Sequence, residues 1–95
     1  MMADTIVREL TLLNRYGLHV RPAGLFAREA SRFDAEVTVE KDGNVVSGKS
    51  IMALMTLEAT CGNVLKVTAS GPQAAEVLDS LEALVNRKFD IPDEQ

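Results

Sequence analysis

The only histidine of the chain lies in a segment whose residue types suit the binding of a phosphate group. The segment reads Gly17-Leu18-His19-Val20-Arg21-Pro22-Ala23. Pro22 has a fixed φ and no amide hydrogen, so it favours the first turn of a helix and leaves His19 just before that turn. Unpaired backbone N–H groups and the positive end of the helix dipole favour an anion there. The sequence therefore predicts a nucleophile beside an anion-binding site.

Two arginines add positive charge near this histidine. Arg21 follows His19 by two residues, and its guanidinium can donate two parallel hydrogen bonds to phosphate oxygens. Arg28 lies seven residues further along, so the two arginines share one stripe of the helix, away from its apolar stripe. We expect both side chains to face solvent on the side of His19. The structural alternative is a capped helix with surface arginines and no bound anion.

A second unusual segment reads Gly48-Lys49-Ser50-Ile51-Met52-Ala53-Leu54-Met55. Ser50 is expected to cap a short helix, which would stabilise it by about 1 kcal/mol. Leu54 and Leu57 supply one buried face for that helix. Ile51, Met52 and Met55 then fall on another face, where methionines would form an adaptable apolar patch for partner proteins. Periodicity equally allows the alternative that all of these residues belong to the core.

The elements that must position these segments alternate between strands and helices. Strands are predicted at 5–13, 36–40, 44–47 and 64–70, and helices at 22–32, at 50–57 and from Gly71-Pro72 to about Asn86. Asp42-Gly43 predicts a tight hairpin turn. The order β-α-β-β-α-β-α predicts an α+β open-faced sandwich, with a four-stranded antiparallel sheet and three helices on one face. We expect one domain over residues 1–95, with a frayed tail from Asp90 to Gln95.

Composition excludes several classes of protein. A net charge of −4 and few aromatic residues argue against a nucleic-acid-binding protein. One histidine and one cysteine, far apart, do not make a metal site. Cys61, the only cysteine, permits no internal disulfide and is expected in a turn before Gly62. The longest apolar run, residues 51–55, is too short to cross a bilayer, and no secretory signal is visible, so we expect a cytoplasmic protein.

The two segments together resemble the active-site and regulatory-serine motifs of the HPr family, the histidine phosphocarriers of the bacterial phosphoenolpyruvate-dependent phosphotransferase system. The resemblance implies that Enzyme I phosphorylates His19 on Nδ1 and that the group passes to an IIA-type protein. Arg21 would stabilise the phosphoryl group, and Ser50 would be phosphorylated by an ATP-dependent HPr kinase/phosphorylase. The resemblance implies a monomeric carrier without cofactor rather than an enzyme. Its docking surface would comprise Val20, Gly24, Arg28, Lys49, Ile51, Met52 and Met55.

Some residues depart from the family pattern. Val20 stands where alanine is usual, Gly24 where a larger residue is common, and Ala53 and Glu58 where glycine is frequent. Glu58 adds a charge near the docking helix that can change partner choice. The segments 33–37, 70–73 and 89–90 resemble the nitrogen-related branch of the family, whereas the Ser50 motif resembles the sugar-uptake branch. Both branches therefore stay open.

Two further alternatives also stay open. The first is a regulatory HPr-like protein that acts mainly through Ser50, although such relatives lose the histidine that this chain keeps. The second is a small-ligand-binding domain of ferredoxin-like layout, because unrelated modules share this order of elements. No glycine-rich loop or polar pocket motif supports the second alternative.

Overall fold

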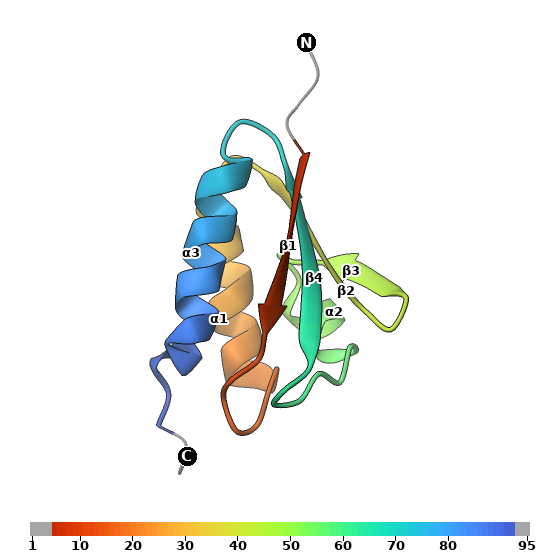
Figure 1. Ribbon diagram of the computed structural model, residues 1–95, viewed down its shortest axis with the longest axis vertical. Helices are drawn as coiled ribbons and strands as arrows, with labels where there is room; N and C mark the ends of the chain where they lie inside the picture. The colour runs from red at the N-terminus through yellow and green to blue at the C-terminus, as the bar shows by residue number, and fades with distance from the viewer. Residues whose placement is uncertain (1–4, 93–95) are drawn as a thin grey trace.

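Four antiparallel strands form one sheet with helices packed over one of its faces (Figure 1). The computed structural model describes residues 5–92. The strands are β1 (Thr5–Thr11), β2 (Glu36–Lys41), β3 (Asn44–Ser47) and β4 (Val64–Ser70), in the sheet order β1-β4-β2-β3. The helices are α1 (Val20–Ala30), α2 (Ile51–Met55), α3 (Ala74–Asn86) and the short 3-10 helix η1 (Lys88–Asp90). The predicted fold class, an α+β open-faced sandwich, is confirmed.

The core lies between the sheet and the helices, as the sequence periods predict. Leu65, Val67 and Ala69 alternate along β4 and are fully buried. The predicted apolar stripes of α1 and α3 are buried against them, and Phe26 of α1 is one of the largest side chains of this core. Burial of such a large apolar side chain stabilises the fold by about 1.5–3 kcal/mol. The buried residues of α1 run from Pro22 to Ala30, so the core packs against the helix along its whole length.

α1 begins two residues earlier than predicted, so that His19 itself is the N-cap residue. The first backbone hydrogen bond of the helix runs from the Ala23 N–H to the His19 carbonyl, 2.9 Å away. The three residues before Ala23 need no intrahelical partner, and a proline fits the third of these positions as well as the first. Pro22 therefore marks the first turn correctly but not its first residue. None of the helices among residues 5–92 is long and apolar enough to span a membrane.

The chain after α3 turns back onto the core instead of leaving it. Phe89 adopts a positive φ of 58° within η1 and is buried, and Ile91 is half-buried against the same core. The Asp90 N–H donates to the Arg87 carbonyl at 3.0 Å. Phe89 and Ile91 thus pack the start of the predicted tail against the core, and residues 93–95 lie outside the described part of the chain.

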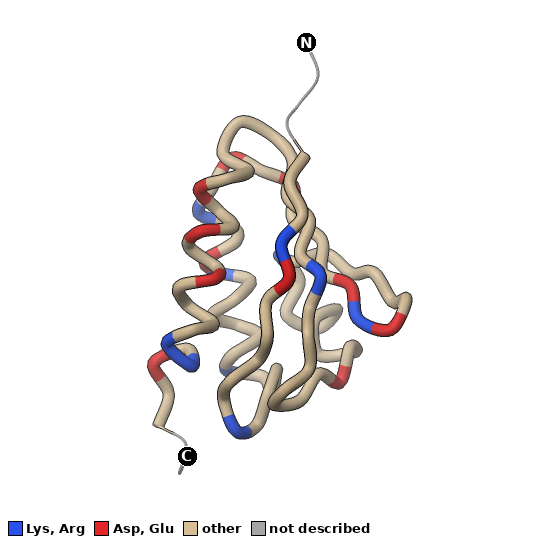
Figure 2. The backbone as a smooth tube through the Cα atoms, in the orientation of Figure 1, with Lys and Arg blue, Asp and Glu red and all other residues tan. Residues whose placement is uncertain are grey.

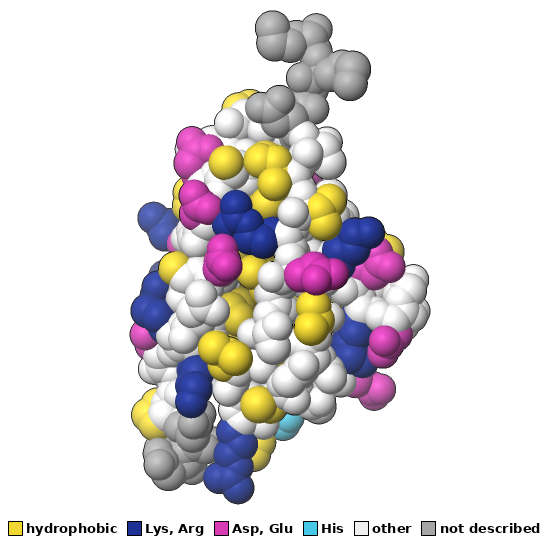
Figure 3. Space-filling view, viewed as in Figure 1, with side chains coloured by type: hydrophobic (Ala, Val, Ile, Leu, Met, Phe, Trp, Pro, Cys, Tyr) yellow, Lys and Arg dark blue, Asp and Glu magenta, His cyan; other side chains and the backbone are white. Residues whose placement is uncertain are grey.

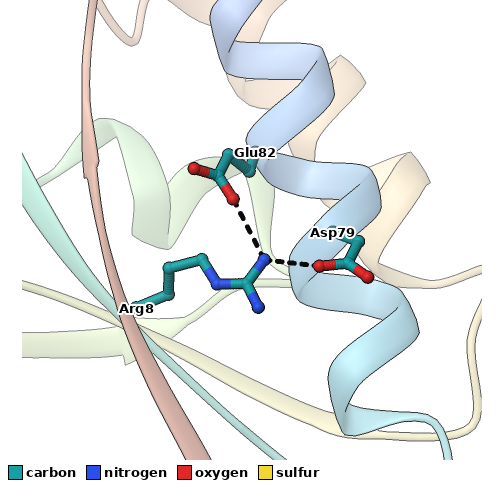
Figure 4. Close-up of polar contacts among 3 residues, drawn as sticks. All are labelled: Arg8, Asp79 and Glu82. Carbon is teal, nitrogen blue, oxygen red and sulfur yellow. Dashed lines mark hydrogen bonds and ion pairs between the residues drawn. The ribbon is translucent and has the colours of Figure 1, made fainter.

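Ion pairs join the middle of the edge strand β1 to the middle of α3. Arg8 of β1 contacts Asp79 at 2.7 Å and Glu82 at 3.0 Å, both on α3 (Figure 4). The hydrogen bond with Asp79 raises the pKa of Arg8. In a second contact, the Ser80 hydroxyl donates to Glu29 of α1, and this bond lowers the pKa of Glu29. Arg8 thus links α3 to the edge strand β1, and Ser80 links α3 to α1.

Candidate functional site

His19 lies on the surface at the lower end of the molecule, where the turn after β1 leads into α1 (Figures 1 and 3). Its backbone is extended, with φ −69° and ψ −179°, and its side chain makes no capping hydrogen bond. The N–H groups of Val20 and Arg21 precede the first intrahelical bond, so helix geometry leaves them without a carbonyl partner. The imidazole thus has no capping role to fulfil, although it lies beside the positive end of a helix dipole.

A glycine sets the path of the chain into this site. Gly17 has a positive φ of +66°, and the next residue, Leu18, donates its N–H to the Ala59 carbonyl at 3.0 Å. A Cβ atom on Gly17 would lie 2.2 Å from that same carbonyl oxygen. On the other side, the Asn14 amide donates to the Gly17 carbonyl at 2.7 Å. The turn that carries His19 is therefore fixed on both sides by the fold.

A Gly17→Ala substitution is expected to destabilise the protein more than the matched change Gly62→Ala. Both glycines have positive φ, so both variants place an L side chain in the left-handed region. Only Gly17 also has backbone in the way, since nothing lies within 4 Å of a Cβ on Gly62. We expect Gly17→Ala to lose about 2 kcal/mol more of the free energy of unfolding, measured by urea denaturation. Equal losses in the two variants would contradict the close packing of the turn.

One cavity, of about 160 Å³, lies on the turn side of His19. It is lined by Arg15, Tyr16, Arg21 and Pro92, the last from the segment after α3, together with His19. The Tyr16 ring lies 5.8 Å from the His19 ring at an angle of 48°, and the Arg15 guanidinium lies 5.3 Å from the centre of the Tyr16 ring. This cavity, which we call the cationic cavity, places two arginines beside the imidazole.

The sequence patterns predict Arg21 in this place but not Arg15, Tyr16 or Asn14. In the sequence, Arg15 and Tyr16 belong only to a turn. An arginine and an aromatic residue directly before Gly17 are nevertheless a pattern that could have pointed to both side chains. Asn14 is only 6% exposed and also lines the cationic cavity. Its side-chain Oδ1 is buried and has no hydrogen-bond partner among the described residues. Asn14 thus supports the turn through its amide nitrogen alone.

A second cavity, of about 390 Å³, lies on the other side of His19. It is lined by Leu18, His19, Val20, Met55, Glu58, Ala59 and Thr60. Most of these side chains are apolar or neutral, and Val20 is 62% exposed. We call this hollow the apolar cavity. It connects the histidine directly to the end of α2.

The outer face of α2 is an exposed apolar patch, which settles the choice that periodicity left open. Leu54 and Leu57 are buried, whereas Ile51, Met52 and Met55 are 42%, 81% and 40% exposed. A Cβ atom on Gly24 would lie 3.8 Å from Ile51 Cδ1, so α1 meets the patch at this glycine. Met55 also lines the apolar cavity. The patch and His19 therefore form one continuous surface.

Ser50 has the capping role that the sequence predicts. Its hydroxyl accepts a hydrogen bond from the Ala53 N–H at 3.2 Å, and the side chain is half-buried. Ser50, Lys49 and Arg28 line neither of the two cavities, although Lys49 and Arg28 are exposed. The structure thus joins His19, Arg21, Val20 and Met55 at the cavities and leaves the other predicted residues outside them.

The charges around His19 differ on its two sides. Arg15 and Arg21 line the cationic cavity, and Lys and Arg positions mark this lower end of the backbone (Figure 2). Glu58 is the acidic residue of the apolar cavity. Residues 5–92 contain no group of three or more His, Cys, Asp or Glu side chains that could hold a metal ion. An anion at the imidazole would be stabilised from the side of the arginines.

Comparison with known proteins identifies related sequences over nearly the whole chain. A family model described as the PTS HPr component phosphorylation site matches residues 6–87. The phosphocarrier protein HPr of Treponema pallidum is 39% identical over 85 residues, which cover 90% of this chain and 97% of that protein. The HPr-like protein Crh of Bacillus subtilis is 44% identical over 72 residues, 76% of this chain and 85% of that protein. The curated relatives also include a phosphocarrier protein NPr.

Solved structures show the same arrangement of elements. The crystal structure of HPr-C-His from Thermoanaerobacter tengcongensis superposes with a TM-score of 0.82 at 39% identity. The match covers 94% of this chain and 98% of that chain. With so much of the chain matched, the fold that positions His19 is shared with that protein.

Proposed function

This chain belongs to the HPr family of phosphocarrier proteins, and on that premise we propose that it carries a phosphoryl group on His19. The donor is phospho-Enzyme I, itself charged by phosphoenolpyruvate. The acceptor is the histidine of an IIA-type protein. The protein turns over no substrate of its own, because partner proteins both add and remove the group. We expect it to work as a monomer without a cofactor.

The proposed chemistry needs little from the protein beyond position and charge. A neutral imidazole is available near pH 7 and can attack phosphorus without a separate base. The bond between phosphorus and the donor nitrogen breaks as a bond to Nδ1 of His19 forms. Negative charge then spreads over the phosphoryl oxygens. The N–H groups at the start of α1 and the Arg21 guanidinium are suited to stabilise that charge.

A carrier must also give the group up. His19 is exposed and lines two open cavities, so a second protein can reach the imidazole. One or two arginines hold the phosphoryl oxygens less tightly than a bound metal ion would. The observation that carries the proposal is therefore a solvent-exposed imidazole between an arginine-lined cavity and an apolar patch.

The apolar patch of α2 is the proposed docking surface for Enzyme I and for the IIA-type acceptor. Ile51, Met52 and Met55 offer exposed apolar area, and Val20 continues it towards His19. Gly24 of α1 lies beside Ile51, whose Cδ1 atom would be in ordinary contact, at 3.8 Å, with a Cβ at this position. The exposed Arg28 and Lys49 add positive charge around this surface. A partner seated here would reach His19 directly.

Ser50 is the proposed site of regulation by an HPr kinase/phosphorylase. Its hydroxyl caps α2, so a phosphate there would lie at the favourable end of a helix dipole and leave the helix intact. The same phosphate would place negative charge beside the docking patch. A regulatory HPr-like protein that acts mainly through Ser50 is the second candidate function, kept because an HPr-like protein, Crh, is among the relatives. His19 and its two cavities favour the carrier.

Arg21 and Arg28 are expected to affect transfer in different ways. Arg21→Ala removes a charge-assisted contact to the phosphoryl oxygens, which is worth about 1.5–3 kcal/mol. We therefore expect kcat for phosphorylation by Enzyme I to fall about 10- to 100-fold. Arg28→Ala is expected to raise KM and retain kcat, because Arg28 lines neither cavity. Steady-state kinetics with purified Enzyme I distinguish the two, and equal kcat losses would contradict this division of roles.

The proposed function is tested by following phosphate through the protein. The purified chain is mixed with Enzyme I and phosphoenolpyruvate, and acid-labile phosphate per protein molecule is measured. IIA proteins of the sugar and nitrogen branches are then added separately, because relatives named HPr and NPr both match this chain. We expect one phosphate per molecule and its loss to one of the IIA proteins. Failure to take up phosphate from Enzyme I would refute the proposal.

A further inference from the structure

Glu58 has a backbone conformation that its residue type does not favour. It follows α2 and has a φ of 51°, in the left-handed region where glycine is the residue without a steric penalty. Its N–H donates to the Met55 carbonyl at 3.2 Å, which holds it at the end of the helix. A residue kept in a sparsely populated conformation next to a functional group is a reason to look for a role of its side chain.

The negative charge of Glu58 differs from the charges of the side chains around it. Its side chain is exposed and lines the apolar cavity with His19, where the other lining side chains are apolar or neutral. The charged residues of the docking surface, Arg28 and Lys49, are positive, and so is Arg21 at the cationic cavity. Among the described residues that line a cavity at His19, Glu58 is the acidic one. A partner that docks on this surface must therefore contact one negatively charged group, the Glu58 carboxylate.

Docking of a partner raises the free-energy cost of the Glu58 charge. When a partner covers the apolar cavity, Glu58 loses water and lies in the same hollow as the imidazole that receives the phosphoryl group. Its carboxylate and the phosphoryl oxygens are both negative and would repel each other in a medium of lower dielectric constant. A positively charged side chain of the partner, placed between the Glu58 carboxylate and the phosphoryl oxygens, would attract both groups. Partners without such a group would be rejected.

We propose that Glu58 is a specificity residue that selects partners with an arginine or lysine beside their reactive histidine. The inference rests on the proposed function, since it assumes that phosphoryl donors and acceptors dock at His19. The apolar cavity, of about 390 Å³, is more than twice the size of the cationic one and has room for a long side chain. The positive group of the partner would lie in the apolar cavity and contact the Glu58 carboxylate. The phosphoryl group would face Arg21 on the opposite side.

The experiment measures KM and kcat for phosphorylation by cognate phospho-Enzyme I at low and high salt. Glu58→Gln removes the charge and keeps the size of the side chain, and Glu58→Lys reverses the charge. Glu36→Gln changes the net charge equally but lies at the start of β2, at the opposite end of the molecule from His19 (Figure 1). Thermal unfolding of each variant verifies that the fold is retained.

We expect Glu58→Gln to raise KM roughly threefold to tenfold at low salt and Glu58→Lys to raise it further, with kcat little changed. The differences should shrink at about 0.5 M salt, where screening weakens the pair. Glu36→Gln should behave as the unchanged protein does. A KM for Glu58→Gln that is unchanged, or lower than that of the unchanged protein, would overturn the inference. If the unchanged protein takes up no phosphate at all, the proposed function fails instead, so the two failures are distinguishable.

Discussion

A His19→Ala variant is expected to take up no acid-labile phosphate from phosphoenolpyruvate and Enzyme I. The loss should exceed about 1,000-fold in rate, because the attacking nitrogen is absent and the exposed N–H groups and arginines have nothing to act on. The fold should be almost unaffected. His19 is exposed and makes no capping hydrogen bond, so its replacement is expected to change the free energy of unfolding by less than about 0.5 kcal/mol.

Cys61→Ser is the matched control for this variant. Cys61 is exposed in a turn, as the sequence predicts, and lines neither cavity at His19. Its replacement should leave phosphate uptake unchanged while it removes the one thiol. Labelled phosphate is measured by filter binding at neutral pH for both variants, with urea denaturation alongside. Full uptake by His19→Ala would show that another residue accepts the phosphate.

Negative charge at Ser50 is expected to reduce phosphorylation by Enzyme I roughly 100-fold, which matches the upper end of the loss expected for Arg21→Ala. Asp and Asn are both good N-cap residues of nearly the same shape, so Ser50→Asp and Ser50→Asn should retain α2 equally. Only the aspartate places charge beside the patch of Ile51 and Met52, which a partner must cover. Loss of water by an unpaired charge costs about 3 kcal/mol or more, equivalent to roughly a 100-fold loss.

This prediction is checked by comparing kcat/KM for phosphorylation of the two variants by Enzyme I. Ser50→Asp should be impaired by about two orders of magnitude and Ser50→Asn only slightly. Circular dichroism should show the same helix content in both, since the block acts on docking and not on the fold. Equal rates for Ser50→Asp and Ser50→Asn would contradict docking over Ser50. Loss of helix in Ser50→Asp alone would attribute the effect to the fold.

The parts of the site that local chemistry dictates could be predicted from the sequence. Pro22 and the residues after it indicate a helix start, so the sequence alone is enough to place His19 at that start. Ser50 is a cap residue followed by a short apolar helix, and it caps α2. Both inferences depend on neighbours in the chain. They need no knowledge of the tertiary fold.

The parts that depend on tertiary contacts could not be predicted. The period of α2 groups Ile51, Met52 and Met55 on one face but does not say whether another element covers that face. The neighbourhood of His19 includes Pro92 and Ala59, which are brought there only by the fold-back after α3 and by the loop after α2. The burial of Phe89 also depends on tertiary contacts and could not be predicted from the sequence. A short acidic tail looks frayed in sequence, but its beginning is held by a buried aromatic side chain.

The decisive experiment locates the phosphate on the unchanged protein. The chain is phosphorylated with Enzyme I and phosphoenolpyruvate, and nitrogen-15 NMR at neutral pH identifies the modified ring nitrogen. We predict a single phosphohistidine at Nδ1 of His19, whose signals return to those of the free imidazole when the matching IIA-type protein is added. A phosphate found on any other side chain, or one on His19 that no IIA-type protein removes, would contradict the proposal that His19 carries the phosphoryl group between partners.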